Sequence, residues 1–221
     1  MKTKLFLPVF YTLTILFLVS EYVHIFSLSL IFKTILMPFL MVYYYSHIKN
    51  QINKFHKIIL TAFFFSWLGD TVLMFDKSSP LFFIFGLGSF LTTHLIYIYA
   101  FTMTKHKFSL LKSKPYLIFP ILIYAITLFV LLQPHLKELL IPVSVYTLAI
   151  FCMVVMSLNR WKNTNSKSFW YIFVGAVLFM FSDSFLSWNI FVEHKIYFSS
   201  IIMLLYTTGQ FLIAKGCIEQ E

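Results

Sequence analysis

The chain has 221 residues, of which 60% are hydrophobic and 11% are charged, and its formal net charge is +9. A soluble domain carries about 25% charged residues, so this chain cannot cover a water-facing surface, which excludes a soluble globular protein. Because the cations are spread over short loops, they form no basic surface for nucleic acid, and we expect membrane lipids as partners instead.

Eight apolar segments follow one another along the chain, and most reach the roughly 20 residues that cross the hydrocarbon core. Their approximate ranges are 5–20, 27–46, 57–75, 80–104, 115–133, 137–157, 168–191 and 196–216. No A-x-A-like cleavage site follows the first segment, so we expect a retained helix there. The loops are short, which predicts antiparallel neighbours. We therefore predict one all-α domain over residues 1–221, a bundle of eight transmembrane helices.

The cations alternate between the two sides of this bundle. Thirteen fall at the N-terminus, in the even-numbered loops and at the C-terminus: Lys2, Lys4, Lys49, Lys54, Lys57, Lys105, Lys107, Lys112, Lys114, Arg160, Lys162, Lys167 and Lys215. Three fall in the odd-numbered loops: Lys77, Lys137 and Lys195. The positive-inside rule then predicts that both termini and the even-numbered loops are cytoplasmic.

Two aspartates interrupt the apolar segments. Asp70 lies within the run 58–75, and Asp183 lies within the run 169–191. A carboxylate at the centre of a membrane helix costs roughly 2.5–3.5 kcal/mol on insertion scales. Two such costs in one short chain indicate a polar interior, and we interpret both aspartates as functional-site residues within the membrane.

Lys33 falls at a similar predicted depth. With a rise of about 1.5 Å per residue, Asp70 and Asp183 lie about 20 and 22 Å from the cytoplasmic ends of their helices. Lys33 lies roughly 9 Å from the outer end of the second helix. All three are thus expected in the outer half of a core about 30 Å thick. Lys33 either pairs with one of the aspartates or extends its side chain to the outer interface.

Further polar residues are predicted in the same region. His94 and Tyr97 share one helix face, as do Tyr206 and Gln210, and Asn189 follows Asp183 on its own helix. Each can bind a substrate, or it can simply form an interhelical hydrogen bond, which contributes about 0.6 kcal/mol. We interpret all five, together with Lys33, as candidate substrate-binding residues.

The surroundings of the two aspartates resemble each other. Residues 69–73 read Gly-Asp-Thr-Val-Leu, and residues 182–186 read Ser-Asp-Ser-Phe-Leu. Aligning them shifts the chain by 113 residues, about half its length. The similarity indicates either a parallel repeat of four plus four helices or a chance match of five residues.

Paired buried carboxyls suit one class of reaction. Low dielectric favours a protonated carboxyl, while a lysine or other donors can hold a second one as carboxylate. Such a pair can hydrolyse an enol ether, in which a general acid protonates carbon and the carboxylate stabilises the oxocarbenium ion. The sequence contains no GxSxG, HExxH or phosphate-binding glycine loop. We therefore predict no metal and no cofactor.

Several segments resemble the YhhN family of integral membrane proteins, which includes the eukaryotic lysoplasmalogenases. They are Lys33-Thr-Ile-Leu-Met-Pro38, Ser66-Trp-Leu-Gly-Asp70, His94-Leu-Ile-Tyr97, Ser182-Asp-Ser-Phe-Leu-Ser-Trp-Asn189 and Tyr206-Thr-Thr-Gly-Gln210. One departure is Thr34, since the family usually has proline directly after this lysine. The resemblance implies an eight-helix membrane protein with Asp70 and Asp183 as catalytic residues.

The resemblance also implies a reaction. The reaction is hydrolysis of the vinyl ether bond of lysoplasmalogen, or of a related lysophospholipid, to a fatty aldehyde and a glycerophospho-headgroup. We expect a multi-pass protein of the bacterial inner membrane. Which aspartate is the acid, which lipid is bound and whether the chain dimerises stay open at the level of sequence.

Two alternatives to an enzyme fit the same residues. Buried acids also relay protons, so a proton-coupled or small-molecule transporter is the main alternative. A structural scaffold, in which the acids only hold helices together, is the other.

Overall fold

A computed structural model describes residues 3–76, 78–104 and 108–220. Within this part of the chain every regular element is helical and none is a β-strand. The elements are α1 (Thr3–Tyr22), α2 (Phe26–Ile48), α3 (Lys54–Leu73), α4 (Pro80–Thr102), α5 (Leu110–Ser113), η1 (Pro115–Ile118), α6 (Phe119–Leu136), η2 (Lys137–Leu139), α7 (Leu140–Leu158), α8 (Ser166–Phe191) and α9 (Ile196–Ile218). Lys2, Lys77, Lys105 and Lys107, which enter the predicted orientation, lie outside the described residues.

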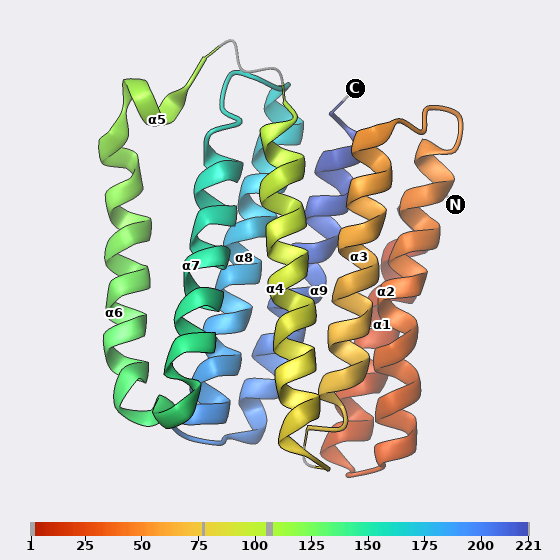
Figure 1. Cartoon of the computed structure of the whole chain (residues 1–221). Helices are drawn as coiled ribbons and strands as arrows, with labels where there is room; N and C mark the ends of the chain where they lie inside the picture. Colours follow the sequence, from red (N-terminus) through yellow and green to blue (C-terminus); the bar gives the residue numbers. More distant parts are fainter. Residues whose placement is uncertain (1–2, 77, 105–107, 221) are drawn as a thin grey trace. The chain divides into compact units, whose positions relative to one another are not determined.

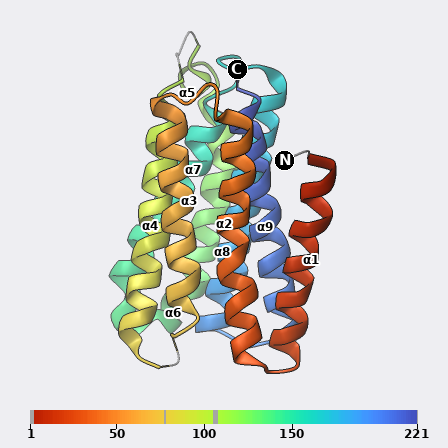
Figure 2. The same ribbon diagram turned by 90° about the vertical axis from the view of Figure 1, so that its right-hand side faces the viewer.

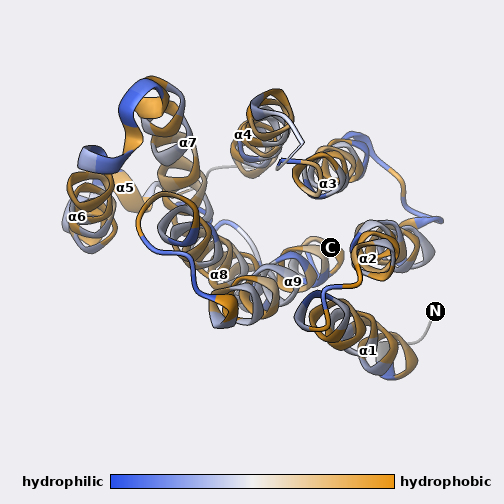
Figure 3. Ribbon diagram, turned by 90° about the horizontal axis from the view of Figure 1, so that it is seen from below, coloured by the Kyte–Doolittle hydropathy of each residue, from blue (hydrophilic) through white to orange (hydrophobic). Residues whose placement is uncertain are grey.

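The predicted all-helical architecture is confirmed. Each of the eight apolar segments corresponds to one long helix of the described chain. Among the residues that the structure describes, six stretches are long and apolar enough to cross a membrane, and one of them, Pro115–Leu158, contains both α6 and α7. The stretch that contains α3 is not among the six, and α3 carries Lys54, Lys57 and Asp70. Figure 3 shows that hydrophilic residues are concentrated in the connecting loops. The helices of the described chain are therefore consistent with a multi-pass membrane protein.

Asparagine caps set the start of two helices. The Asn53 side chain accepts a hydrogen bond from the His56 backbone N–H, and α3 begins at the next residue. The Asn165 side chain accepts one from the Ser168 N–H in the same way, so α8 begins at Ser166. Such caps satisfy backbone donors that the first helical turn leaves without partners.

The turn between α6 and α7 is tight. Lys137, the first residue of the short η2, adopts a positive φ of 46° directly after α6, and α7 begins directly after η2. Leu132, Leu136 and Val143 form a buried apolar cluster at this turn, against which Trp188 of α8 packs. This cluster fixes α6 and α7 as a hairpin beside α8.

The chain divides into two compact units, Met1–Tyr97 and Ile98–Glu221, and the boundary falls near the end of α4. In the first unit, α1, α2, α3 and α4 run antiparallel to their neighbours in sequence (Figure 1 and Figure 2). Gly69 of α3 faces the Phe90 ring of α4, where an added Cβ would lie 2.8 Å from ring carbons. This glycine therefore lets α3 and α4 approach closely.

In the second unit, α6, α7, α8 and α9 also alternate in direction (Figure 1). The helices α8 and α9 approach each other closely. An added Cβ on Gly175 would lie 2.8 Å from the Gly209 carbonyl oxygen, and one on Gly209 would lie 2.9 Å from the Gly175 carbonyl oxygen. Small residues are the usual means of close helix packing in membranes. The two helices are thus in direct backbone contact.

Candidate functional site

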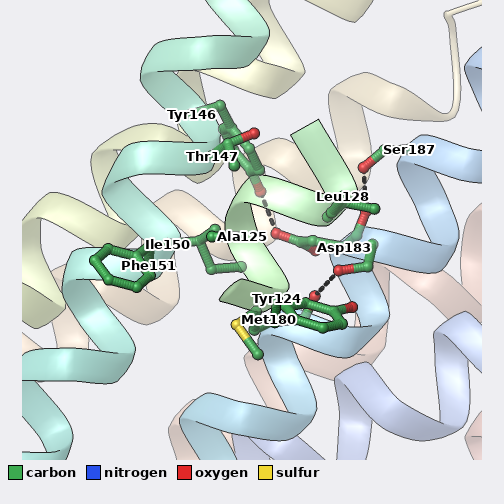
Figure 4. Close-up of a pocket in the computed structure, with 11 residues that line it drawn as sticks. Tyr124, Ala125, Leu128, Tyr146, Thr147, Ile150, Phe151, Met180, Asp183 and Ser187 are labelled. Atoms are coloured by element: carbon green, nitrogen blue, oxygen red, sulfur yellow. Dashed lines mark hydrogen bonds between the residues drawn. The ribbon is translucent and has the colours of Figure 1, made fainter. Parts of the chain in front are cut away.

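A pocket lies within the second unit between α6, α7 and α8. Its empty volume is about 330 Å³, which includes space open to the surroundings. Figure 4 shows the residues that line it. The polar ones are Tyr124, Tyr146, Thr147, Asp183, Ser184 and Ser187, and the rest of the lining is apolar. A largely apolar pocket with a few converging polar groups is the usual form of a small-molecule site.

Asp183 is the carboxylic acid residue that lines this pocket. Its side chain is 8% exposed, and its Oδ2 atom accepts a hydrogen bond from the Tyr146 hydroxyl of α7. Figure 4 shows the two side chains pointing toward each other from α8 and α7. Hydrogen bonds to an ionised acceptor are roughly twice as strong as neutral ones. Tyr146 therefore gives the Asp183 carboxyl a hydrogen-bond donor from a neighbouring helix.

Two serines beside Asp183 use their protons within α8. The Ser184 hydroxyl donates to the Met180 carbonyl oxygen at 2.7 Å, and the Ser187 hydroxyl donates to the Asp183 carbonyl oxygen. The Tyr124 hydroxyl of α6 interacts with the Ser184 side chain. Because their protons are committed to the backbone, both serines present acceptor lone pairs to the rest of the pocket.

Both polar residues predicted on the last helix are buried, and Tyr206 lies against α8. Tyr206 is 4% exposed and Gln210 is 0% exposed. The Tyr206 ring packs edge-on against Phe179, with 5.3 Å between ring centroids. The Ser182 hydroxyl donates to the Ile202 carbonyl oxygen at 3.0 Å. Both predicted α9 residues are therefore buried, and their part in a site stays a prediction.

Asn189 lies near the end of α8 and is 8% exposed. Its Oδ1 atom accepts a hydrogen bond from the Lys195 backbone N–H at 2.8 Å. This bond closes the turn between α8 and α9, so Asn189 has a structural partner in addition to any part in binding.

In the first unit, Asp70 lies on α3 and is 4% exposed. One turn earlier, the Ser66 hydroxyl donates to Thr93 Oγ1 of α4 at 3.3 Å, and Thr93 in turn donates to the Ala62 carbonyl oxygen. His94 and Tyr97 follow on α4, each 0% exposed. Asp70 and both predicted α4 residues are thus buried in the folded chain.

Lys33 lies on α2 and is partly buried. Its ammonium lies over the Phe17 ring of α1, with 5.4 Å between Nζ and the ring centroid. A cation over an aromatic face is attracted by the ring quadrupole. The structure therefore gives the Lys33 ammonium an aromatic contact on the helix that precedes it.

The residue after Lys33 is joined to the Asp70 helix. Pro38 lies inside α2 and has no backbone N–H, so it cannot bond to the carbonyl four residues earlier, which is that of Thr34. The Trp67 indole of α3 donates to the Thr34 oxygen at 3.0 Å. A carbonyl left open by proline is thereby satisfied by a neighbouring helix, as membrane proteins require.

Sequence reasoning missed Tyr146, Tyr124 and Trp67. Tyr146 carries a hydroxyl well inside an apolar helix rather than at its end, which was an available signal. For Trp67 the signal was the proline of α2, whose open carbonyl needs a donor. Asp70 and Asp183 belong to different units, so their place in one polar interior stays a prediction. Among the described residues, no group of three His, Cys, Asp or Glu side chains could hold a metal ion.

Comparisons with known proteins add one family and several relatives. The YhhN family pattern matches residues 28–217. The chain is 29% identical over 150 residues to the lysoplasmalogenase TMEM86B of Sus scrofa, a match that covers 67% of this chain and 58% of the relative. The Mus musculus lysoplasmalogenase TMEM86B is 31% identical over 149 residues, which cover 67% of this chain and 58% of that relative. The Homo sapiens lysoplasmalogenase TMEM86B is 27% identical over 154 residues, which cover 69% of this chain and 60% of that relative. The chain thus spans less than two thirds of these relatives, and no solved structure matches it.

Proposed function

Because the chain belongs to the YhhN family, we propose that it is a membrane hydrolase that cleaves the vinyl ether bond of lysoplasmalogen or a related lysophospholipid. The relatives that bear the name lysoplasmalogenase support this reaction. The observation that carries the proposal is the buried Asp183 carboxyl in an apolar pocket between three helices. That setting suits a substrate with a long apolar chain and an acid-sensitive bond.

The proposed reaction needs one carboxylic acid and one carboxylate, which are Asp70 and Asp183. The acid transfers its proton to the β-carbon of the vinyl ether, and an oxocarbenium ion forms. The carboxylate stabilises this cation and then takes a proton from the water that attacks it. The resulting hemiacetal collapses to aldehyde and alcohol when its hydroxyl proton returns to the first aspartate and the second aspartate protonates the leaving oxygen. Both aspartates then regain their starting states.

The remaining predicted site residues would bind the substrate headgroup or orient the acids. They are Lys33, His94, Tyr97, Asn189, Tyr206 and Gln210. In this proposal the lipid enters from the bilayer, and its apolar chain lies between helices while its polar end reaches the aspartates. The large apolar side chains that the helices leave exposed support such lateral entry.

The proposed setting is a bacterial inner membrane. All eight long helices would span the bilayer, including α3, with both termini cytoplasmic and with the two four-helix halves related as a parallel repeat. The alternation of cations between successive loops supports this topology.

The test is release of fatty aldehyde from lysoplasmalogen by the purified protein in detergent or liposomes. We expect activity in the wild type and a loss of at least about 100-fold in Asp70→Asn and in Asp183→Asn, because general acid–base catalysis contributes about 10²–10⁴-fold. Asp76→Asn, in the turn that follows α3, is the matched control and should retain activity. Full activity in either catalytic variant, or ion-coupled solute uptake without any hydrolysis, would contradict the proposal.

A further inference from the structure

Tyr146 has a place in the candidate site that neither the sequence pattern nor the family resemblance assigns. Its side chain is 8% exposed, and its hydroxyl donates to Asp183 Oδ2. We propose that Tyr146 is a positioning residue that holds Asp183 as the carboxylate, so that Asp183 stabilises the cation and Asp70 is the proton donor. This inference rests on the proposed function and assigns the two roles that the function leaves open.

The chemistry of the hydrogen bond supports the direction of this assignment. A phenol is a much weaker acid than a carboxylic acid, so the proton of the pair stays on Tyr146. An ionised carboxyl in an apolar setting is costly unless donors satisfy its oxygens. Removing the donor would therefore penalise the ionised form of Asp183 and leave its neutral form little affected.

The geometry adds a reason why Tyr146 positions the carboxyl. Tyr146 and Asp183 come from different helices, α7 and α8, and both line the same pocket. The bond therefore fixes the rotamer of Asp183 relative to the pocket wall that α7 and α6 form. A carboxylate must be held within about 0.5 Å of its productive position for efficient catalysis.

With this assignment, every proton in the reaction has a stated place. Asp70 gives a proton to the β-carbon, and the new C–H bond leaves an oxocarbenium ion opposite the Asp183 carboxylate. Water adds to this cation and loses a proton to Asp183. Asp183 then protonates the leaving glyceryl oxygen as the carbon–oxygen bond breaks, and the hemiacetal hydroxyl returns a proton to Asp70. No oxidant, reductant or further reactant is needed.

Infrared spectroscopy tests the protonation states without any substrate. A protonated carboxyl has a carbonyl stretching band that an ionised carboxylate lacks. At neutral pH we expect this band in the wild type, its loss in Asp70→Asn and its retention in Asp183→Asn. Loss of the band in Asp183→Asn, or no such band in the wild type, would overturn the assignment. The result does not depend on turnover, so it remains decisive if the protein proves to hydrolyse no vinyl ether.

Kinetics test the positioning role. Tyr146→Phe should lower kcat by about 10- to 100-fold with little change in KM, as expected for loss of one hydrogen bond to a charged group. Tyr124→Phe is the matched variant, because it removes a hydroxyl from the same pocket but leaves the Tyr146–Asp183 bond intact. We expect its effect to fall on KM rather than kcat.

A double variant separates positioning from simple structural damage. In an Asp183→Asn background, Tyr146→Phe should cause no further loss of the residual activity, because the carboxylate that Tyr146 holds is already gone. An additional loss as large as that in the wild-type background would overturn the positioning role, and so would equal kcat losses in Tyr146→Phe and Tyr124→Phe.

Discussion

The hydrogen bond between Trp67 and Thr34 predicts an energetic coupling between two helices of the first unit. In Trp67→Phe the aromatic ring stays but the donor to the Thr34 carbonyl is lost, and Pro38 cannot supply a replacement. In Pro38→Ala a backbone N–H returns four residues after Thr34, so the carbonyl can be satisfied within α2. Trp67→Phe should therefore lower the free energy of unfolding clearly when residue 38 is proline, and much less in the Pro38→Ala background.

The size of this coupling follows from the free-energy cost of leaving the Thr34 carbonyl oxygen without a hydrogen bond. A buried polar group that loses its hydrogen bond costs about 1–3 kcal/mol in proteins generally. Hydrogen bonds between membrane helices average about 0.6 kcal/mol, with a maximum near 1.7. Trp67 is only partly buried, so we expect a coupling of about 0.5–1.5 kcal/mol between the two substitutions. The loss of indole packing affects both backgrounds equally and cancels in the cycle.

The assay is reversible unfolding of the purified protein in mixed micelles, measured for the wild type, both single variants and the double variant. Pro8→Ala provides the control, because Pro8 lies inside α1 in the same unit but four residues after Lys4 rather than Thr34. Pro8→Ala should show no coupling to Trp67→Phe. If Trp67→Phe costs the same with proline or alanine at position 38, the argument from the open carbonyl is wrong.

Two further predictions concern the second unit. Gly175→Ala should lower the unfolding temperature strongly, because its Cβ would lie 2.8 Å from the Gly209 carbonyl oxygen. The control is Gly88→Ala in the first unit, where an added Cβ has nothing within 4 Å, and it should be neutral or stabilising by up to about 1 kcal/mol. Equal effects of the two substitutions would contradict the backbone contact between α8 and α9. Arg160→Lys should cost about 1–3 kcal/mol, because one ammonium cannot reproduce the separate guanidinium bonds to Thr104, Ser168 and Gln220. Burial lowers the pKa of Arg160 from 12.5 to about 10, so the charged guanidinium lowers the free energy of unfolding. This destabilisation is fully present below pH 10 and is lost only as the pH rises from about 10 toward 12.5. Unfolding measured between pH 7 and 9 should therefore give the same free-energy difference between wild type and Arg160→Gln, whose side chain does not titrate, throughout this range, and a slope would contradict the stated pKa.

The helices themselves could be predicted from sequence because each apolar segment is long and bounded by polar loops. Their ends were less predictable, and the reason is local. Asn53 and Asn165 cap α3 and α8, which begin at Lys54 and Ser166 rather than near positions 57 and 168. Both caps follow the usual preference for asparagine before a helix and could have been used.

The partners of the site residues could not be predicted in the same way. A helix that is apolar on every side gives no periodic signal for the direction in which one polar residue points. Asp183 could be recognised as unusual, but nothing in the spacing identified Tyr146, which lies 37 residues earlier on another helix. Likewise, Lys33 was expected to meet an aspartate or the interface, and its contact with Phe17 depends on how α1 packs against α2.

The contact between Gly175 and Gly209 bears on how the chain is made. Only a short turn, closed by Asn189 and Lys195, separates α8 from α9, so the two helices can leave the ribosome and enter the bilayer together as a hairpin. Inserted in this way, the helix that carries Asp183 contacts the helix with Tyr206 and Gln210 before it is exposed alone to lipid. The free-energy cost of placing the Asp183 carboxyl in the bilayer during insertion is correspondingly reduced.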